Sequence, residues 1–167
     1  RLGWADAGVI VPWIVWKQFA DVDIVNDNWD SMALYMKHID ETKYDHNALK
    51  KENGNSQYAD WLSYEPMESH SKQQYITVNG KRELKPEAVG YWNFLSAAYW
   101  AMDAEMMVDM AVATGRDAAP YREMNERAKR YIRSKFLKAD GTFKTEILNT
   151  MQTPALFALK AGVVEGK

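Results

Sequence analysis

The sequence predicts an all-α fold, an incomplete α/α toroid with one small β-hairpin at about residues 74–84. Five helical segments are indicated by the periodicity of apolar residues, and they alternate between two kinds. The first, third and fifth are apolar nearly all round, whereas the second and fourth have one polar face. A helix that is apolar on every side has to be enclosed by neighbours. The alternation therefore predicts three inner helices, with two outer helices that cover them.

Residues 7–20 form the first predicted inner helix, in which Trp13, Trp16 and Phe19 recur at helical spacing. Pro12 falls near the first turn, where a missing N–H does little harm. Residues 23–40 form the first predicted outer helix, and Asp23 is expected to cap it. Its apolar face follows a 4-3-4-3 spacing through Val25, Trp29, Met32, Met36 and Ile39.

A long polar connection, residues 42–86, separates this first helix pair from the rest of the chain. Near its end, residues 74–84 alternate around Asn79-Gly80, which is a strong signal for a two-residue hairpin turn. Loops of this length in compact domains are usually functional or disordered. Because the connection contains Asp60-Trp61, we expect it to carry part of a binding pocket.

The remaining helices repeat the alternation. Residues 87–114 form an inner helix closed by Gly115, and residues 117–137 form an outer helix capped by Asp117. The last inner helix begins at Met151 or Thr153 and ends near residue 161. We expect the N-termini of the inner helices, with their free N–H groups, to gather at one end of the ring.

Composition narrows the classes of function. A chain of 167 residues suits one domain, and its net charge of −2 offers no basic field for nucleic acid. It has no cysteine, its three histidines lack metal-ligand spacing, and no apolar stretch reaches the ~18 residues of a membrane span. We therefore expect no metal, no cofactor and no membrane partner. No signal peptide is recognised, and the chain begins with Arg1, so we expect a segment of a larger protein.

Two pairings of tryptophan with aspartate point to carbohydrate. Trp4 and Asp6 precede the first inner helix, and Asp60-Trp61 lies in the connection before the third helix. An indole offers a flat apolar face to sugar C–H groups, and a carboxylate accepts hydrogen bonds from hydroxyls. Structural interpretations stay open: Asp6 caps a helix as readily as it binds sugar, and Trp4 or Trp61 can serve packing.

The chain resembles glycoside hydrolase family 78, the inverting α-L-rhamnosidases, whose catalytic domain is a six-hairpin α/α barrel. The segment Gly3-Trp4-Ala5-Asp6-Ala7 followed by Val9-Ile10-Val11-Pro12-Trp13 is similar to the family's GWGDAxVIVPW. Asp60-Trp61-Leu62 resembles GDWL, with Ala59 in place of glycine, and Gln152-Thr153 opens a helix similar to QTAxALAL. The similarity covers nearly the whole of residues 1–167, as a single segment of the catalytic domain.

The resemblance implies which groups belong to the chain and which do not. The family's general acid is a glutamate in a cysteine-containing motif upstream of residue 1, and its general base lies beyond Lys167. We therefore expect no catalytic residue here. The implied substrate-binding residues are Trp4, Asp6, Trp13, Asp60, Trp61 and Gln152. The implied substrate is a terminal α-L-rhamnoside, and secretion or a periplasmic location is plausible for the intact enzyme.

Two other functions remain open at this stage. Other glycosidases share the toroid and act on different sugars, since a fold does not determine a substrate. A non-catalytic helical-repeat interaction module also begins with alternating helix pairs. An incomplete ring should in addition expose apolar flanks on its first and fifth helices, and from these we expect self-association.

Overall fold

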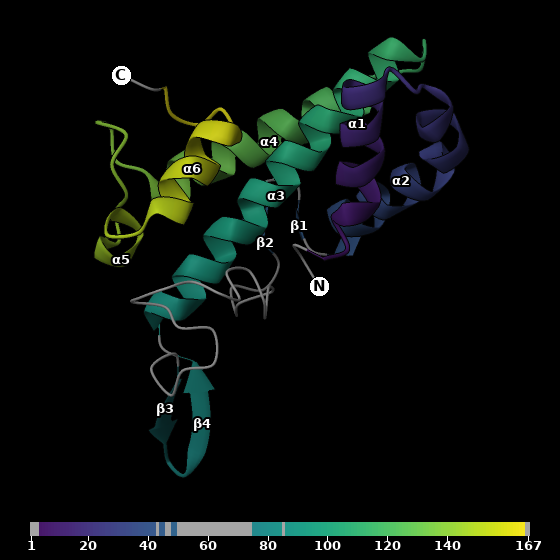
Figure 1. Cartoon of the computed structure of the whole chain (residues 1–167). Coiled ribbons are helices and arrows are strands. Elements are labelled where there is room, and N and C mark those ends of the chain that lie inside the picture. The colour runs from purple at the N-terminus through teal and green to yellow at the C-terminus, as the bar shows by residue number, and fades with distance from the viewer. Residues whose placement is uncertain (1–3, 43, 46–47, 50–74, 85, 166–167) are drawn as a thin grey trace.

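The computed structural model describes residues 4–42, 44–45, 48–49, 75–84 and 86–165. Six helices account for most of this part of the chain (Figure 1). They are α1 (Ala7–Phe19), α2 (Asp23–Thr42), α3 (Pro86–Ala113), α4 (Ala119–Phe136), α5 (Glu146–Asn149) and α6 (Gln152–Lys160). Two short antiparallel strand pairs complete the description: β1 (Tyr44–Asp45) with β2 (Ala48–Leu49), and β3 (Tyr75–Val78) with β4 (Lys81–Leu84).

The helix α3 is the centre of the molecule, and α1 and α6 lie on either side of it (Figure 1). All three helices run in the same direction, upward in Figure 1. From Tyr91 to Ala104 nearly every α3 side chain is buried, and Trp100 and Phe94 are completely enclosed. The inner helix predicted at residues 87–114 is therefore confirmed, and its surroundings explain why it is apolar on all sides.

The amphipathic helices α2 and α4 form the outer layer and run opposite to the inner helices (Figure 1). Arg127 Nη2 of α4 donates to Asp40 Oδ2 of α2 at 2.8 Å, and Arg116 Nη1, in the connection before α4, donates to Asn26 Oδ1 of α2 at 2.8 Å. The buried Asn125 Nδ2 of α4 donates to the Ala101 carbonyl of α3 at 2.7 Å. The predicted arrangement of three inner and two outer helices is thus confirmed.

The start of α2 differs from the prediction. The backbone N–H groups of Asp23 and Ile24 donate to Asp21 Oδ1 at 3.1 and 3.4 Å. The carboxylate that caps this helix therefore belongs to Asp21, and the prediction of Asp23 as the cap was wrong. Asp117 does act at the start of α4, because the Ala119 N–H donates to its Oδ1 at 2.8 Å.

The hairpin predicted at about 74–84 is present as β3 and β4, joined by Asn79-Gly80. Asn79 has φ 50° and Gly80 has φ 75°, the two positive values that a type I′ turn requires. The short helix α5 and the pair β1–β2 were not predicted. At α5, Asn149 exchanges hydrogen bonds with the backbone of Phe143 at 3.0 and 2.9 Å, which closes the preceding turn.

The two flanking inner helices are covered on one side only. Large apolar side chains remain exposed on both, namely Val11, Ile14 and Phe19 on α1 and Leu156 and Leu159 on α6. Enclosure on all sides is therefore right for α3 but wrong for α1 and α6 as they stand here. Exposed flanks at the first and last inner helices are what an incomplete ring predicts.

Candidate functional site

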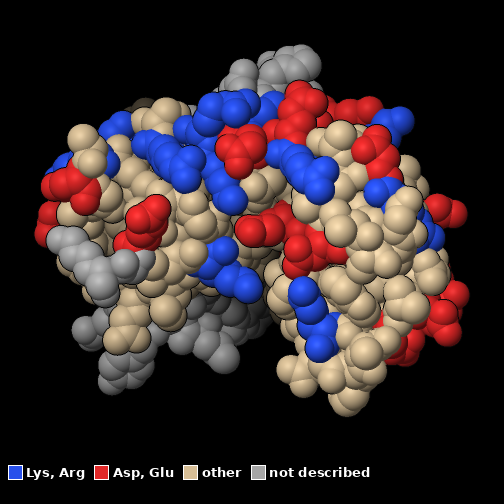
Figure 2. Space-filling model, turned by 90° about the horizontal axis from the view of Figure 1, so that it is seen from above, with Lys and Arg blue, Asp and Glu red and all other residues tan. Residues whose placement is uncertain are grey.

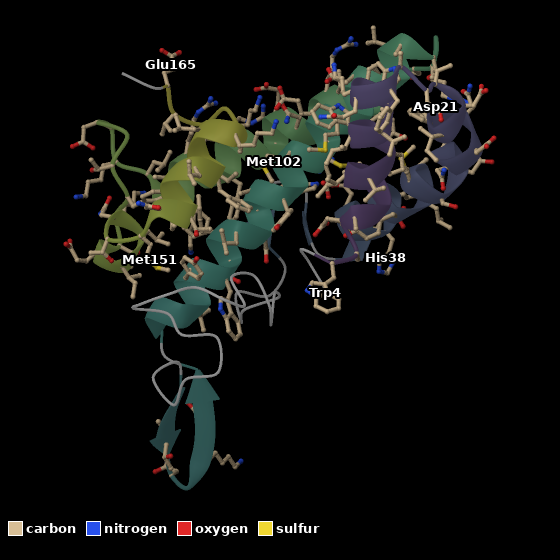
Figure 3. The ribbon with its side chains drawn as sticks, in the orientation of Figure 1. Trp4, Asp21, His38, Met102, Met151 and Glu165 are labelled. Atoms are coloured by element: carbon tan, nitrogen blue, oxygen red, sulfur yellow. The ribbon has the colours of Figure 1, made fainter. Side chains whose placement is uncertain are left out.

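The N-termini of α1, α3 and α6 point toward the same end of the molecule, the lower end in Figure 1. Trp4 lies beside the start of α1, and Met151 lies beside the start of α6 (Figure 3). The Trp4 side chain is 67% exposed, and Gln152, the first residue of α6, is also exposed. The inner-helix N-termini thus face one end of the molecule, which carries an exposed indole and an exposed amide, and the convergence of these groups with Asp60-Trp61 stays a prediction.

Asp6 lies at the N-cap position of α1, but its side chain does not cap the helix. Its carbonyl oxygen accepts hydrogen bonds from the N–H groups of Val9 and Ile10, both at 2.9 Å. The carboxylate is completely buried, and its Oδ1 accepts a hydrogen bond from the Tyr35 hydroxyl of α2 at 2.5 Å. Side-chain capping by Asp6 is therefore wrong, because a partner from another helix holds the carboxylate.

The second neighbour of Asp6 is Asp103, a residue of α3 that is also completely buried. The two carboxyl groups lie next to each other, within reach of a hydrogen bond if one of them is protonated. Burial raises the pKa of Asp103 well above its ordinary value, and the charge on Asp6 and the hydrogen bond to it raise the pKa further. Among the described residues, no donor other than the Asp6 carboxyl reaches either Asp103 oxygen. Burial beside a second carboxyl group therefore favours the protonated form of Asp103.

This carboxyl pair does not have the geometry of a glycosidase acid and base. Inverting hydrolysis needs two carboxyls about 6.5–9.5 Å apart with a water molecule between them. Asp6 and Asp103 are in direct hydrogen-bond contact, and both are inaccessible to solvent. The pair can join helices and place the residues next to it, but it has no room for the attacking water.

Trp13 lies about two turns further along α1, away from Trp4 and Asp6. Its Nε1–H donates to Asp109 Oδ2 at 3.1 Å, and its ring faces two ammonium groups, Lys17 at 5.6 Å and Lys160 at 5.2 Å. A pocket of about 140 Å³ adjoins it, which is smaller than the ~300–1,000 Å³ usual for ligand sites. The structure therefore separates Trp13 from the other predicted sugar-binding residues that it describes.

A larger hollow, about 940 Å³, is found elsewhere, between the end of α4 and residues 162–165. Its described lining contains none of the predicted sugar-binding residues, so size alone does not mark the site.

Seen from above, basic and acidic side chains interleave across the molecule, without a field of one sign (Figure 2). In the part of the chain that the structure describes, no three acidic or histidine side chains cluster as a metal site would. None of its helices has the length and apolar character needed to cross a bilayer.

Asp60 and Trp61 lie outside the described residues, so their position relative to Trp4 stays a prediction. Asp103 and Tyr35 were not predicted as site residues. For Asp103 a signal existed: a carboxylate within a helix expected to be enclosed on all sides must find a partner, because an isolated buried charge is very costly. For Tyr35 the sequence carried no comparable signal.

Parallel inner helices covered by antiparallel outer helices are the arrangement of an α/α-hairpin domain. Residues 1–167 match the bacterial alpha-L-rhamnosidase six-hairpin glycosidase domain, and the chain belongs to this family. The chain is thus a segment of an alpha-L-rhamnosidase hairpin domain, as the resemblance implied.

Two relatives show how much of such a protein the chain represents. It is 26% identical over 142 residues to an alpha-L-rhamnosidase of Streptomyces avermitilis, and this match covers 85% of this chain and 11% of the relative. It is 25% identical over 161 residues to an alpha-L-rhamnosidase of Formosa agariphila, and this match covers 94% of this chain and 15% of the relative. The chain therefore spans only a small part of the length of these relatives.

The fold is shared with a solved structure, that of Streptomyces avermitilis alpha-L-rhamnosidase complexed with L-rhamnose. The match has a TM-score of 0.71 at 22% identity, and it covers 96% of this chain and 12% of the other. At this identity the likeness establishes the fold, and it agrees with the predicted incomplete toroid.

Proposed function

We propose that this chain forms part of the wall of a rhamnose-binding pocket in an inverting α-L-rhamnosidase that cleaves terminal α-L-rhamnosyl residues. Family membership over residues 1–167 carries the proposal. The solved relative that shares the fold was crystallised with L-rhamnose, which supports a rhamnose-containing substrate. The resemblance assigns the general acid and the general base to positions outside this chain, and the buried carboxyl pair, which lacks the separation that water attack needs, is not a substitute for them.

Within this proposal, the residues at the inner-helix N-termini supply binding contacts. The exposed Trp4 indole offers an apolar face for sugar C–H groups, and Gln152 offers both a donor and an acceptor for hydroxyls. Asp60 and Trp61 are assigned to the same pocket by the resemblance, as part of the 42–86 connection. Trp13, with its indole N–H occupied by Asp109, contributes only the face of its ring.

If the general acid and the general base lie outside the chain, the isolated chain should be inactive. The isolated chain should show no hydrolysis of an aryl α-L-rhamnoside above the rate of a buffer control, measured by release of the phenol. Turnover by the isolated chain would contradict the proposal, because it would show that catalytic carboxyls lie within the chain.

Binding is tested separately from turnover. Addition of L-rhamnose should shift the NMR resonance of the Trp4 indole, and Trp4→Ala should weaken binding, whereas Trp29→Phe should not. Trp29 is the matched control because it packs against Tyr121 on the outer layer, with ring centroids 5.8 Å apart. Equal responses to a panel of unrelated sugars would favour a toroid glycosidase of different specificity. Absence of any response, together with capture of a protein partner, would favour the interaction module.

A further inference from the structure

Three helices meet at the buried carboxyl pair. Asp6 belongs to the first turn of α1, Tyr35 to α2 and Asp103 to the middle of α3. Asp6 and Asp103 are 97 residues apart in sequence, and each has no exposed surface. Two residues before Asp6, the chain reaches solvent again at Trp4. The carboxyl pair thus fixes the chain in the core two residues after the exposed Trp4.

We propose that Asp6 and Asp103 share a single proton and that this pair, together with Tyr35, positions Trp4 by fixing the first turn of α1 against α2 and α3. The inference concerns Asp6 and Asp103 as positioning residues, and its bearing on sugar binding rests on the proposed function. A permanent pair of charges would be untenable here, since two carboxylates in contact in a buried site repel strongly. One proton converts this repulsion into a charge-assisted hydrogen bond.

Charged groups on the described helices around the core make contacts of their own. On α1, Lys17 lies 3.5 Å from Asp109 of α3, and on α6, Lys160 lies over Trp13. Between the outer helices, Arg127 of α4 is paired with Asp40 of α2 at 2.8 Å. At the pair itself, the Tyr35 hydroxyl is a further titratable group, and it donates to Asp6.

The shared proton makes the attachment sensitive to pH. Asp103 has a raised pKa in the folded protein and a value of about 3.9 when unfolded, so the folded state holds the extra proton. The stabilisation that this proton contributes is fully present when the pH is below the pKa of Asp103 in the unfolded chain. It decreases as the pH rises toward the pKa of Asp103 in the folded protein. The unfolding equilibrium constant increases by up to tenfold per pH unit in this window, and the decrease ends above the folded pKa. Loss of the proton should loosen the first turn of α1 before the rest of the fold.

The test uses the whole 167-residue chain and compares wild type with Asp103→Asn, between pH 5 and pH 9. An amide at position 103 is permanently neutral and still donates a hydrogen bond to Asp6. Hydrogen exchange is followed at the Val9 and Ile10 amides, which donate to the Asp6 carbonyl, after correction for the intrinsic rate. In wild type their protection should fall with pH by up to tenfold per unit, whereas in Asp103→Asn it should be constant.

The matched control is Glu105→Gln, which makes the same chemical change two residues away on α3. Glu105 is exposed and lies 3.9 Å from Lys129, so its substitution should leave the wild-type pH profile unchanged. If Asp103→Asn does not fold, Asp6→Asn provides the comparison, because it also removes the second charge while keeping an oxygen for Tyr35. It too should flatten the profile.

Two outcomes separate this inference from the proposed function. Identical pH profiles in wild type and the amide variant would overturn the positioning role, whatever the sugar result. A pH-dependent first turn without any effect of L-rhamnose on the Trp4 indole resonance would overturn the proposed function and leave the positioning role supported. If both are right, rhamnose binding should weaken at high pH in wild type and stay constant in Asp103→Asn.

Discussion

The exposed flanks of α1 and α6 lead to a prediction about association. Val11 and Ile14 are 52% and 43% exposed, and Leu156 and Leu159 are 62% and 46% exposed. Full burial of such a side chain contributes about 2 kcal/mol, so covering the exposed half of each contributes roughly 1 kcal/mol. The four together represent roughly 4 kcal/mol per copy, which corresponds to about a thousandfold in a dissociation constant. The isolated chain should therefore form dimers or larger species.

The perturbation is the double variant Val11→Gln with Leu156→Gln, which removes about half of this apolar contribution. Association should weaken by roughly 2 kcal/mol, or about 30-fold, in sedimentation equilibrium. The control is Leu34→Gln, because Leu34 is 68% exposed but lies on the outer helix α2. Its substitution should leave association unchanged. A wild-type chain that stays monomeric at high concentration, or a double variant that associates as strongly as Leu34→Gln, would refute the reasoning.

Two further predictions concern stability. Tyr35→Phe should lower the free energy of unfolding by about 1–3 kcal/mol in urea denaturation, because a buried carboxylate loses a donor. Tyr121→Phe should cost clearly less, and equal losses would contradict the role of the Asp6 contact. Gly80→Ala should cost roughly 1–2 kcal/mol of local stability, because φ is 75° while no other atom obstructs a Cβ. NMR should show weaker contacts between Val78 and Lys81 with unchanged helices, and intact strand pairing would count against this account.

The parts of the fold that follow from local pattern were predictable. Asn79-Gly80 indicates its own turn, because few residue pairs tolerate two positive φ values. The apolar periodicity separates α3 from α2 and α4, since enclosure and one-sided cover leave different patterns in the sequence. The identity of a cap was less predictable: Asp21 and Asp23 are both good capping residues, and only the backbone path decides between them.

The carboxyl pair at the candidate site depends on tertiary contacts and could not be derived in this way. A capping role is the local preference of an aspartate at the start of a helix, and at Asp6 the Tyr35 hydroxyl 29 residues away overrides it. Asp103 was inconspicuous because an apolar helix pattern is judged over many residues, and one carboxylate hardly changes it. Its significance appears only when α1 is placed beside α3.

The parallel alignment of α1 and α3 places the two carboxyl groups at different positions along their helices. A helix carries a partial positive charge at its N-terminus, and this influence fades within the first turn. Asp6 occupies the N-terminal boundary of α1, where that field favours an anion by roughly 0.3–1 kcal/mol. Asp103 sits deep within α3, beyond the reach of either terminus. The macrodipole of α1 therefore acts on one member of the carboxyl pair and leaves the other to the burial and the neighbouring carboxyl that raise its pKa.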